Sequence, residues 1–320
     1  MIREAIEKTY RNTLFIRIDD EGKVHYFSAE DFEGLHKQPF DFRTASGTLL
    51  RGNFYFYAGC EKDRIIVFDH GMGCGHRAYM KEIETLARHG YLVYTYDHTG
   101  CAASEGESLG GFSTSPADLD ACLEVLKREK PMGERRISVI GHSWGAFATM
   151  NIAPRHPDVC HLVALAGPIS TKTMIEQSMG GPLALYRKYI LALEEQANPE
   201  FATLDARTSL ANAKMPVLVI HSTDDKTVSY KRHFKALENA LSHKENITFL
   251  TVTRKGHNPN YTEEAVQYKF KLFGDLKKRN KKKLMETPEQ KKAFRDVWDW
   301  NAVTNQDPKL WQIIFDFLDR

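Results

Sequence analysis

Long apolar runs are missing from the chain of 320 residues: no stretch approaches the roughly 20 apolar residues that a membrane-spanning helix needs. Residues 1–8 carry acidic side chains and lack the apolar segment of a secretory signal. Charge of one sign is not in excess either, since 44 lysine and arginine residues face 42 acidic residues. We therefore expect no membrane span and no nucleic-acid partner, because nucleic-acid-binding proteins show a basic excess or stripe.

Cysteine is also scarce, and its placement predicts no disulfide framework. The five cysteines are an odd and scattered set, which favours a reducing cytoplasm. The group Asp69, His70, Cys74 and His76 matches no common zinc spacing. We therefore expect a cytoplasmic protein with no metal and no organic cofactor. The oligomeric state is left open by the sequence.

Composition and length are sufficient for a sizeable core, since 42% of the residues are hydrophobic. Residues 1–39 are predicted to form an N-terminal β extension, with strands at 14–18 and 24–27 around a turn-rich quartet. A second hairpin is expected between 40–43 and 53–57, where aromatic and polar residues alternate. Residues 40–320 are then predicted to form one domain.

From residue 64 the pattern becomes strand, helix, strand, helix. Continuous apolar runs typical of strands covered on both faces occur at 64–68, 91–96, 137–140, 162–165, 217–220 and 247–252. This alternation predicts an α/β fold, a mostly parallel central sheet with helices on both faces. Right-handed crossovers place the loops after these strands along one edge, where polar candidates for chemistry gather.

The alternation pauses between the strands at 162–165 and 217–220. Apolar residues recur there at helical spacing, so we predict a small helical cap at about 169–214. The chain beyond His257 is long, and helices are expected at 265–278, 289–300 and 308–318.

The segment Gly141-His142-Ser143-Trp144-Gly145 joins a predicted strand to a predicted helix. In this context a Gly-x-Ser-x-Gly pentapeptide forms a turn so tight that side chains at its first and last positions would clash. Ser143 is then exposed above the sheet at a helix N-terminus, which stabilises developing negative charge. We therefore predict that Ser143 is a catalytic nucleophile.

A serine hydroxyl is a weak nucleophile and needs a base. Among 13 histidines we choose His257, which follows the last predicted strand and a glycine that lets the loop reach over the sheet edge. The acid is expected in the loop after the strand at 217–220, which contains Asp224 and Asp225. Adjacent side chains in an extended loop point in different directions, so only one of the two can face the histidine.

Stabilising an oxyanion requires two backbone N–H donors. One is expected from Trp144, directly after the predicted nucleophile. The second should come from the glycine-rich loop at 69–76, where the amide of Met72 is the best candidate. Three glycines in that loop permit close approach of backbone to substrate.

As an ordered set, these motifs resemble the α/β-hydrolase superfamily, nearest its monoacylglycerol-lipase-like and carboxylesterase-like branch. The shared segments lie between residues 40 and 262 and are His70-Gly71-Met72-Gly73, 97–106, Gly141-His142-Ser143-Trp144-Gly145, Asp225-Lys226-Thr227-Val228 and Gly256-His257. The resemblance favours Asp225 over Asp224 as the acid. Two departures are Thr99 and Ala102, where the family often has arginine and glycine. The long tail after His257 is a further departure.

The resemblance implies an α/β-hydrolase fold and a serine hydrolase that cleaves a carboxylic ester through an acyl-enzyme on Ser143. A short cap predicts a small or medium acyl group on this small-molecule substrate. Thioester hydrolysis and amide or peptide hydrolysis use the same machinery and stay open. A rival of another class is a non-catalytic ligand receptor on the same fold.

Overall fold

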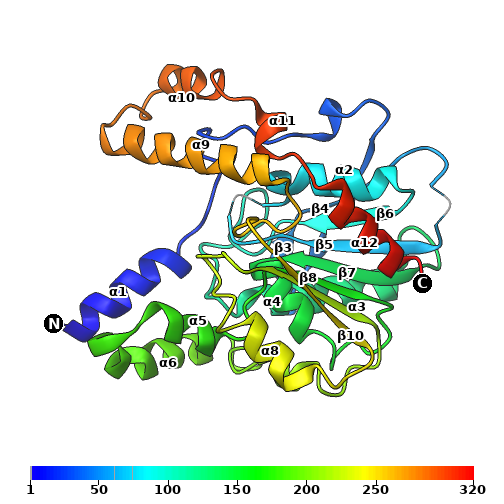
Figure 1. Cartoon of the computed structure of the whole chain (residues 1–320), viewed down its shortest axis with the longest axis horizontal. Helices are drawn as coiled ribbons and strands as arrows, with labels where there is room; N and C mark the ends of the chain where they lie inside the picture. The colour runs from blue at the N-terminus through cyan, green and yellow to red at the C-terminus, as the bar shows by residue number, and fades with distance from the viewer. Residues whose placement is uncertain (1, 61, 74) are drawn as a thin grey trace.

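The computed structural model describes residues 2–60, 62–73 and 75–320 and contains one eight-stranded sheet in the order β1-β4-β6-β5-β7-β8-β9-β10. Figure 1 shows this sheet between layers of helices. Its strands are β1 (His36–Pro39), β4 (Gly52–Phe56), β5 (Arg64–Asp69), β6 (Leu92–Tyr96), β7 (Arg136–His142), β8 (Leu162–Leu165), β9 (Val217–Ser222) and β10 (Ile247–Val252).

The six strands from β6 to β10 in the sheet order run parallel, whereas β1 and β4 join one edge in antiparallel pairings. The predicted parallel strands all form at the expected places, and the predicted fold class is confirmed. A small separate sheet pairs β2 (Phe42–Arg43) with β3 (Leu49–Leu50). The second predicted hairpin, between 40–43 and 53–57, therefore does not form, because β4 pairs with β1 and β6 instead of with 40–43.

Helices cover both faces because successive side chains of the buried strands point to opposite sides. In β5, Ile65 and Val67 pack on one side, and Ile66 and Phe68 pack on the other. The first side is covered by α3 (Thr114–Glu129), α4 (Trp144–Asn151) and α8 (Phe234–Leu241). The second side is covered by α2 (Met80–Arg88) and α12 (Pro308–Leu318).

The N-terminal segment begins with a helix, and the strand pair expected at 14–18 and 24–27 does not form. Helix α1 spans Ile2–Leu14, and residues 24–27 form no strand. Among the described residues, the segment after α1 forms one isolated bridge, between Ile18 and Cys101. β-Branched and aromatic residues at 14–18 favour extended backbone, but without a neighbouring strand they give no hairpin.

The segment between β8 and β9 is helical, as the cap prediction requires, and its division as a separate cap stays a prediction. It contains α5 (Thr171–Ser178), the 3₁₀ helix η3 (Gly181–Tyr186), α6 (Arg187–Ala197) and α7 (Ala206–Ser209). Helix α1 lies beside α5 and α6 (Figure 1), and α1 contacts α6 directly.

The tail after β10 folds into helices near the positions predicted for it. These are α9 (Glu263–Lys281), α10 (Pro288–Arg295), α11 (Trp300–Val303) and α12. Proline at the first turn and an aspartate N-cap at Asp307 fix the start of α12. Two short 3₁₀ helices, η1 (Ala29–Asp31) and η2 (His76–Tyr79), complete the described elements. No helix in the described part of the chain is long and apolar enough to cross a membrane.

Candidate active site

Ser143 occupies the turn between β7 and α4 and has a strained backbone, with φ of 55° and ψ of −111°. A non-glycine residue at positive φ costs free energy and persists only where its surroundings fix it. The Ser143 amide donates to the carbonyl of Leu165 at 2.8 Å, which ties the turn to β8. The hydroxyl is thereby held above the sheet edge.

The glycines on either side of Ser143 are required by close packing. A Cβ on Gly145 would lie 2.0 Å from the carbonyl oxygen of Asp69, and one on Gly141 would lie 2.3 Å from Thr149 Oγ1. Neither position has room for a side chain, which agrees with the tight turn expected from the sequence.

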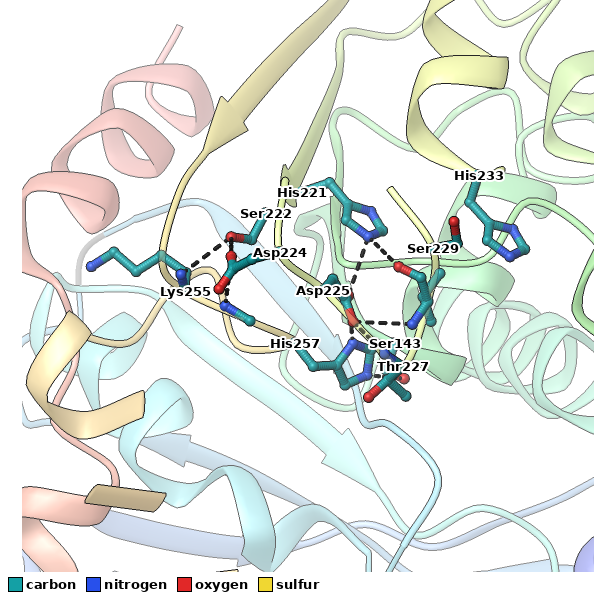
Figure 2. A network of polar contacts seen from close by, with 12 residues as sticks. Ser143, His221, Ser222, Asp224, Asp225, Thr227, Ser229, His233, Lys255 and His257 are labelled. Atoms are coloured by element: carbon teal, nitrogen blue, oxygen red, sulfur yellow. Dashed lines mark hydrogen bonds and ion pairs between the residues drawn. The ribbon is translucent and has the colours of Figure 1, made fainter. Parts of the chain in front are cut away.

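The structure brings Ser143, His257 and Asp225 into one line of hydrogen bonds. His257 Nε2 lies 2.8 Å from Ser143 Oγ, and His257 Nδ1 lies 2.8 Å from Asp225 Oδ2. The imidazole is 21% exposed, whereas the Asp225 side chain is fully buried. Figure 2 shows the three side chains, which come from the ends of β7, β9 and β10. The site can therefore transfer a proton from the serine hydroxyl to the imidazole.

Asp225 is held as a carboxylate by the donors around it. Burial opposes its charge, but hydrogen bonds from His221 and His257 lower the pKa of Asp225 well below its usual value. Its other oxygen, Oδ1, accepts from the amides of Thr227 and Val228 at 2.8 and 3.0 Å. These bonds fix the orientation of the carboxylate toward His257.

Asp224 has a different set of partners. Its Oδ1 accepts from Ser222 Oγ at 2.5 Å and from the Gly256 amide at 3.2 Å. Although partial burial opposes ionisation, these donors lower the pKa of Asp224. The residue joins the loop after β9 to the loop that carries His257, and in the described part of the chain its carboxylate makes no hydrogen bond with the imidazole (Figure 2).

His221 is a neighbour of the site that the sequence analysis did not single out. Its Nε2 lies 2.9 Å from the Val228 carbonyl and 3.2 Å from Asp225 Oδ2. Both partners are acceptors, so this nitrogen carries a proton and donates to the loop. A histidine at the end of a buried strand was the only signal for this role in the sequence.

Tyr79 and His142 form a second connection that sequence reasoning missed. Burial holds the pKa of His142 at about 3, so its ring is neutral. Nε2 lies 2.7 Å from the carbonyl of His257 and donates to it. Nδ1 therefore accepts from Tyr79 Oη at 2.9 Å, and the same Tyr79 oxygen accepts from the Gly71 amide at 3.1 Å. One chain of hydrogen bonds thus links the glycine-rich loop to the backbone that carries His257.

The glycine-rich loop lies directly beside Ser143. A Cβ on Gly71 would lie 2.4 Å from Tyr79 Oη and 3.3 Å from Ser143 Cβ, so a side chain there would displace the tyrosine. Met72 and Ser143 line the same cavity, of about 370 Å³, together with His257. Trp144 begins α4 and its indole is buried, donating to the Phe112 carbonyl at 2.6 Å. Cys74, one member of the metal alternative, lies outside the described residues.

The loop that carries His257 is fastened to the tail of the chain. The buried Lys255 ammonium contacts Asp307 Oδ2 and the Tyr261 carbonyl, both at 2.7 Å. Asp307 also donates its amide to the Asn260 carbonyl at 2.8 Å. The start of α12 therefore helps hold the imidazole in place.

Comparison with known proteins adds family-level information. A family model described as serine aminopeptidase, S33, matches residues 61–199, a segment that contains Ser143 and ends before Asp225 and His257. Protein ABHD8 of Homo sapiens is 27% identical over 127 residues, which are 40% of this chain and 26% of that protein. The α/β hydrolase domain-containing protein aho-3 of Caenorhabditis elegans is 25% identical over 184 residues, or 58% of this chain and 49% of that protein.

Among solved structures, the esterase Pf2001 of Pyrococcus furiosus has the same fold. Its TM-score is 0.59 at 20% identity, and the alignment covers 81% of this chain and 96% of the esterase. The curated relatives are longer, and the chain spans about a quarter of protein ABHD8 and about half of aho-3. The sheet order, the strand–turn–helix at Ser143 and the likeness to the esterase show that the chain has the α/β-hydrolase fold, and the family-model match over residues 61–199 supports a place in that superfamily.

Proposed function

We propose that the protein is a serine hydrolase that cleaves a carboxylic ester through an acyl-enzyme on Ser143. The observation that carries this proposal is the line of hydrogen bonds from Ser143 Oγ through His257 to Asp225, each 2.8 Å long. It is the geometry of a nucleophile with its base and the group that orients the base. The esterase likeness of the fold supports the reaction class at a coarser level.

In the proposed reaction Ser143 Oγ attacks the acyl carbonyl while His257 Nε2 accepts the hydroxyl proton. The amides of Met72 and Trp144 would donate to the oxyanion and stabilise its developing charge. The imidazolium then protonates the departing alcohol. Water, deprotonated by His257, attacks the acyl-enzyme and releases the acid. Asp225 stabilises the imidazolium and holds its Nδ1 proton.

Hydrolysis of an amide is a second candidate, because the matched family model is described as a serine aminopeptidase. The same imidazolium can protonate a departing amine. A panel of p-nitrophenyl esters, acyl thioesters and aminoacyl anilides distinguishes the classes by kcat/KM. Reaction with a fluorophosphonate probe distinguishes any of them from a non-catalytic receptor.

The decisive test is replacement of the nucleophile. Ser143→Ala should lower turnover of the best ester by about three to six orders of magnitude and abolish fluorophosphonate labelling. Circular dichroism should be unchanged, since alanine fits the site of a half-buried serine. Equal turnover in purified Ser143→Ala and unaltered protein would refute the proposal.

A further inference from the structure

Helix α1 presents one face to a large cavity next to the candidate active site. The cavity has a volume of about 700 Å³. The residues of α1 that line it recur at intervals of three and four, as on one face of a helix: Ile2, Ala5, Ile6, Thr9, Tyr10, Thr13 and Leu14. Residues of α5, η3 and α6 form the opposite wall, among them Met174, Ile175, Leu183 and Ile190.

A partly buried polar contact holds α1 against the insertion. Tyr10 Oη donates to Glu194 Oε1 of α6 at 2.6 Å. Burial, reinforced by this carboxylate, raises the pKa of Tyr10 well above its usual value, so the phenol keeps its proton. Glu194 also accepts from the amides of Phe112 and Ser113 at 2.9 and 3.0 Å. These contacts fix the distance between the two walls of the cavity.

The cavity adjoins the candidate active site at Met72. This residue lines both the 370 Å³ cavity that contains Ser143 and the larger cavity under α1. Its side chain packs in one cluster with Leu14, Phe112 and Trp144. An acyl group on Ser143 would therefore reach the space under α1 by passing Met72.

The lining indicates what kind of ligand the larger cavity accepts. Among the described residues that line it, none is charged, and the polar ones are hydroxyl-bearing. Its volume lies in the upper half of the roughly 300–1,000 Å³ range of small-molecule sites. The apolar face is not covered by the rest of the protein, because Ile2 is 64% exposed and Leu183 is 43% exposed. An apolar chain bound there would bury this surface away from water, which is favourable.

We propose that α1 and the α5–α6 insertion together form the acyl-binding site, and that the substrates carry medium or long unbranched acyl chains. This inference rests on the proposed acyl-enzyme at Ser143. The sequence-based expectation of a small or medium acyl group counted the insertion alone, and α1 supplies a second wall. Each additional buried methylene should raise kcat/KM about fourfold until the cavity is filled.

The test compares p-nitrophenyl decanoate with p-nitrophenyl butanoate on the full chain. Ala5→Trp places an indole in the cavity from α1, and Ser178→Trp places one from α5. Each should lower the decanoate-to-butanoate ratio of kcat/KM by at least about tenfold, because several methylenes lose their site. Lys8→Trp is the matched control: it adds the same side chain to α1 at a position that does not line the cavity, and the ratio should stay unchanged.

The outcomes separate this inference from the proposed function. One outcome is butanoate hydrolysis that depends on Ser143, with an unchanged decanoate-to-butanoate ratio of kcat/KM in both Ala5→Trp and Ser178→Trp. That outcome would overturn the proposed acyl-binding site but would leave the proposed hydrolase function unaffected. Binding of decanoate to Ser143→Ala, measured by calorimetry, supplies a readout that needs no catalysis. It should be weakened by Ala5→Trp on that background and retained with Lys8→Trp, and absence of decanoate binding in the parent Ser143→Ala protein would also overturn the inference.

Discussion

The two adjacent aspartates offer a sharp test of the proposed site, because one change of charge can be made at either position. In the structure Asp225 Oδ2 lies 2.8 Å from His257 Nδ1, while Asp224 Oδ1 accepts from Ser222 and Gly256. Asp225→Asn turns one carboxylate oxygen into an NH₂ group. The oxygen that accepts from the Thr227 and Val228 amides is best kept, so the NH₂ group faces His257.

An NH₂ group cannot accept the Nδ1 proton of His257. The imidazole then takes the other tautomer, with its proton on Nε2, and it can no longer remove the proton of Ser143. The same change in a well-studied triad lowers kcat about 10,000-fold. Such a loss corresponds to about 5.5 kcal/mol of transition-state stabilisation, at roughly 1.4 kcal/mol for each factor of ten. Although burial opposes its charge, the carboxylate of Asp225 is ionised at neutral pH in the unaltered protein, because its pKa is lowered by its hydrogen bonds with His221 and His257.

Asp224→Asn is the matched control, since the asparagine oxygen can still accept from Ser222 Oγ and the Gly256 amide. We expect its kcat on the best ester to change no more than a few-fold. Both variants should be purified, checked by circular dichroism and assayed in parallel. A nearly inactive Asp224→Asn beside an active Asp225→Asn would refute the assignment of the acid and the tautomer argument with it.

Two further predictions concern the surroundings of the site. Tyr79→Phe leaves the Gly71 amide and His142 Nδ1 without their hydrogen-bond partner. It should therefore lower the free energy of unfolding measured with urea by about 1–3 kcal/mol and lower kcat. A variant with full stability and full activity would contradict the proposed link between these loops. Burial opposes protonation of His98, but Asp69 and Asp118 outweigh it and raise its pKa to about 10. In the unfolded chain the pKa of a histidine is about 6.5. The contribution of charged His98 to the free energy of unfolding is therefore complete below pH 6.5 and is lost as the pH rises toward 10. Between pH 7 and 10, the free energy of unfolding measured with urea should therefore fall more steeply with pH in the unaltered protein than in His98→Asn. Equal slopes in the two proteins would count against a charged His98.

The parallel part of the fold follows from the sequence because most of its strands, such as β5, β6, β8 and β9, are buried on both faces. Such strands appear as continuous apolar runs, and those of β5 and β9 form where they were predicted. Helix α12 spans the predicted range, since its Asp307 cap and following proline mark the start. The prediction for the N-terminal segment was wrong because it followed the extended-backbone propensity at 14–18, although the apolar residues of 2–14 recur at the spacing of one helical face.

The sequence predicts which residues come together at the candidate site, but it does not predict the hydrogen bonds that hold them in place. Ser143 and His257 follow strand ends, and the topology of a parallel sheet brings such positions to one edge. The structure places both near Asp225, and their catalytic role stays a prediction. Tyr79 and His221 could not be found in the same way, because their contacts depend on side-chain directions across loops far apart in sequence.

The bond between Lys255 and Asp307 has a consequence for how heat would inactivate the protein. The docking of α12 helps to hold the loop that carries His257, whereas the strands of the sheet pair without it. Local opening costs less free energy than global unfolding. Detachment of the tail alone would loosen the loop that carries the imidazole while the strands stay paired. In the proposed mechanism, activity is therefore lost on heating when the tail detaches, at a lower temperature than the unfolding of the core.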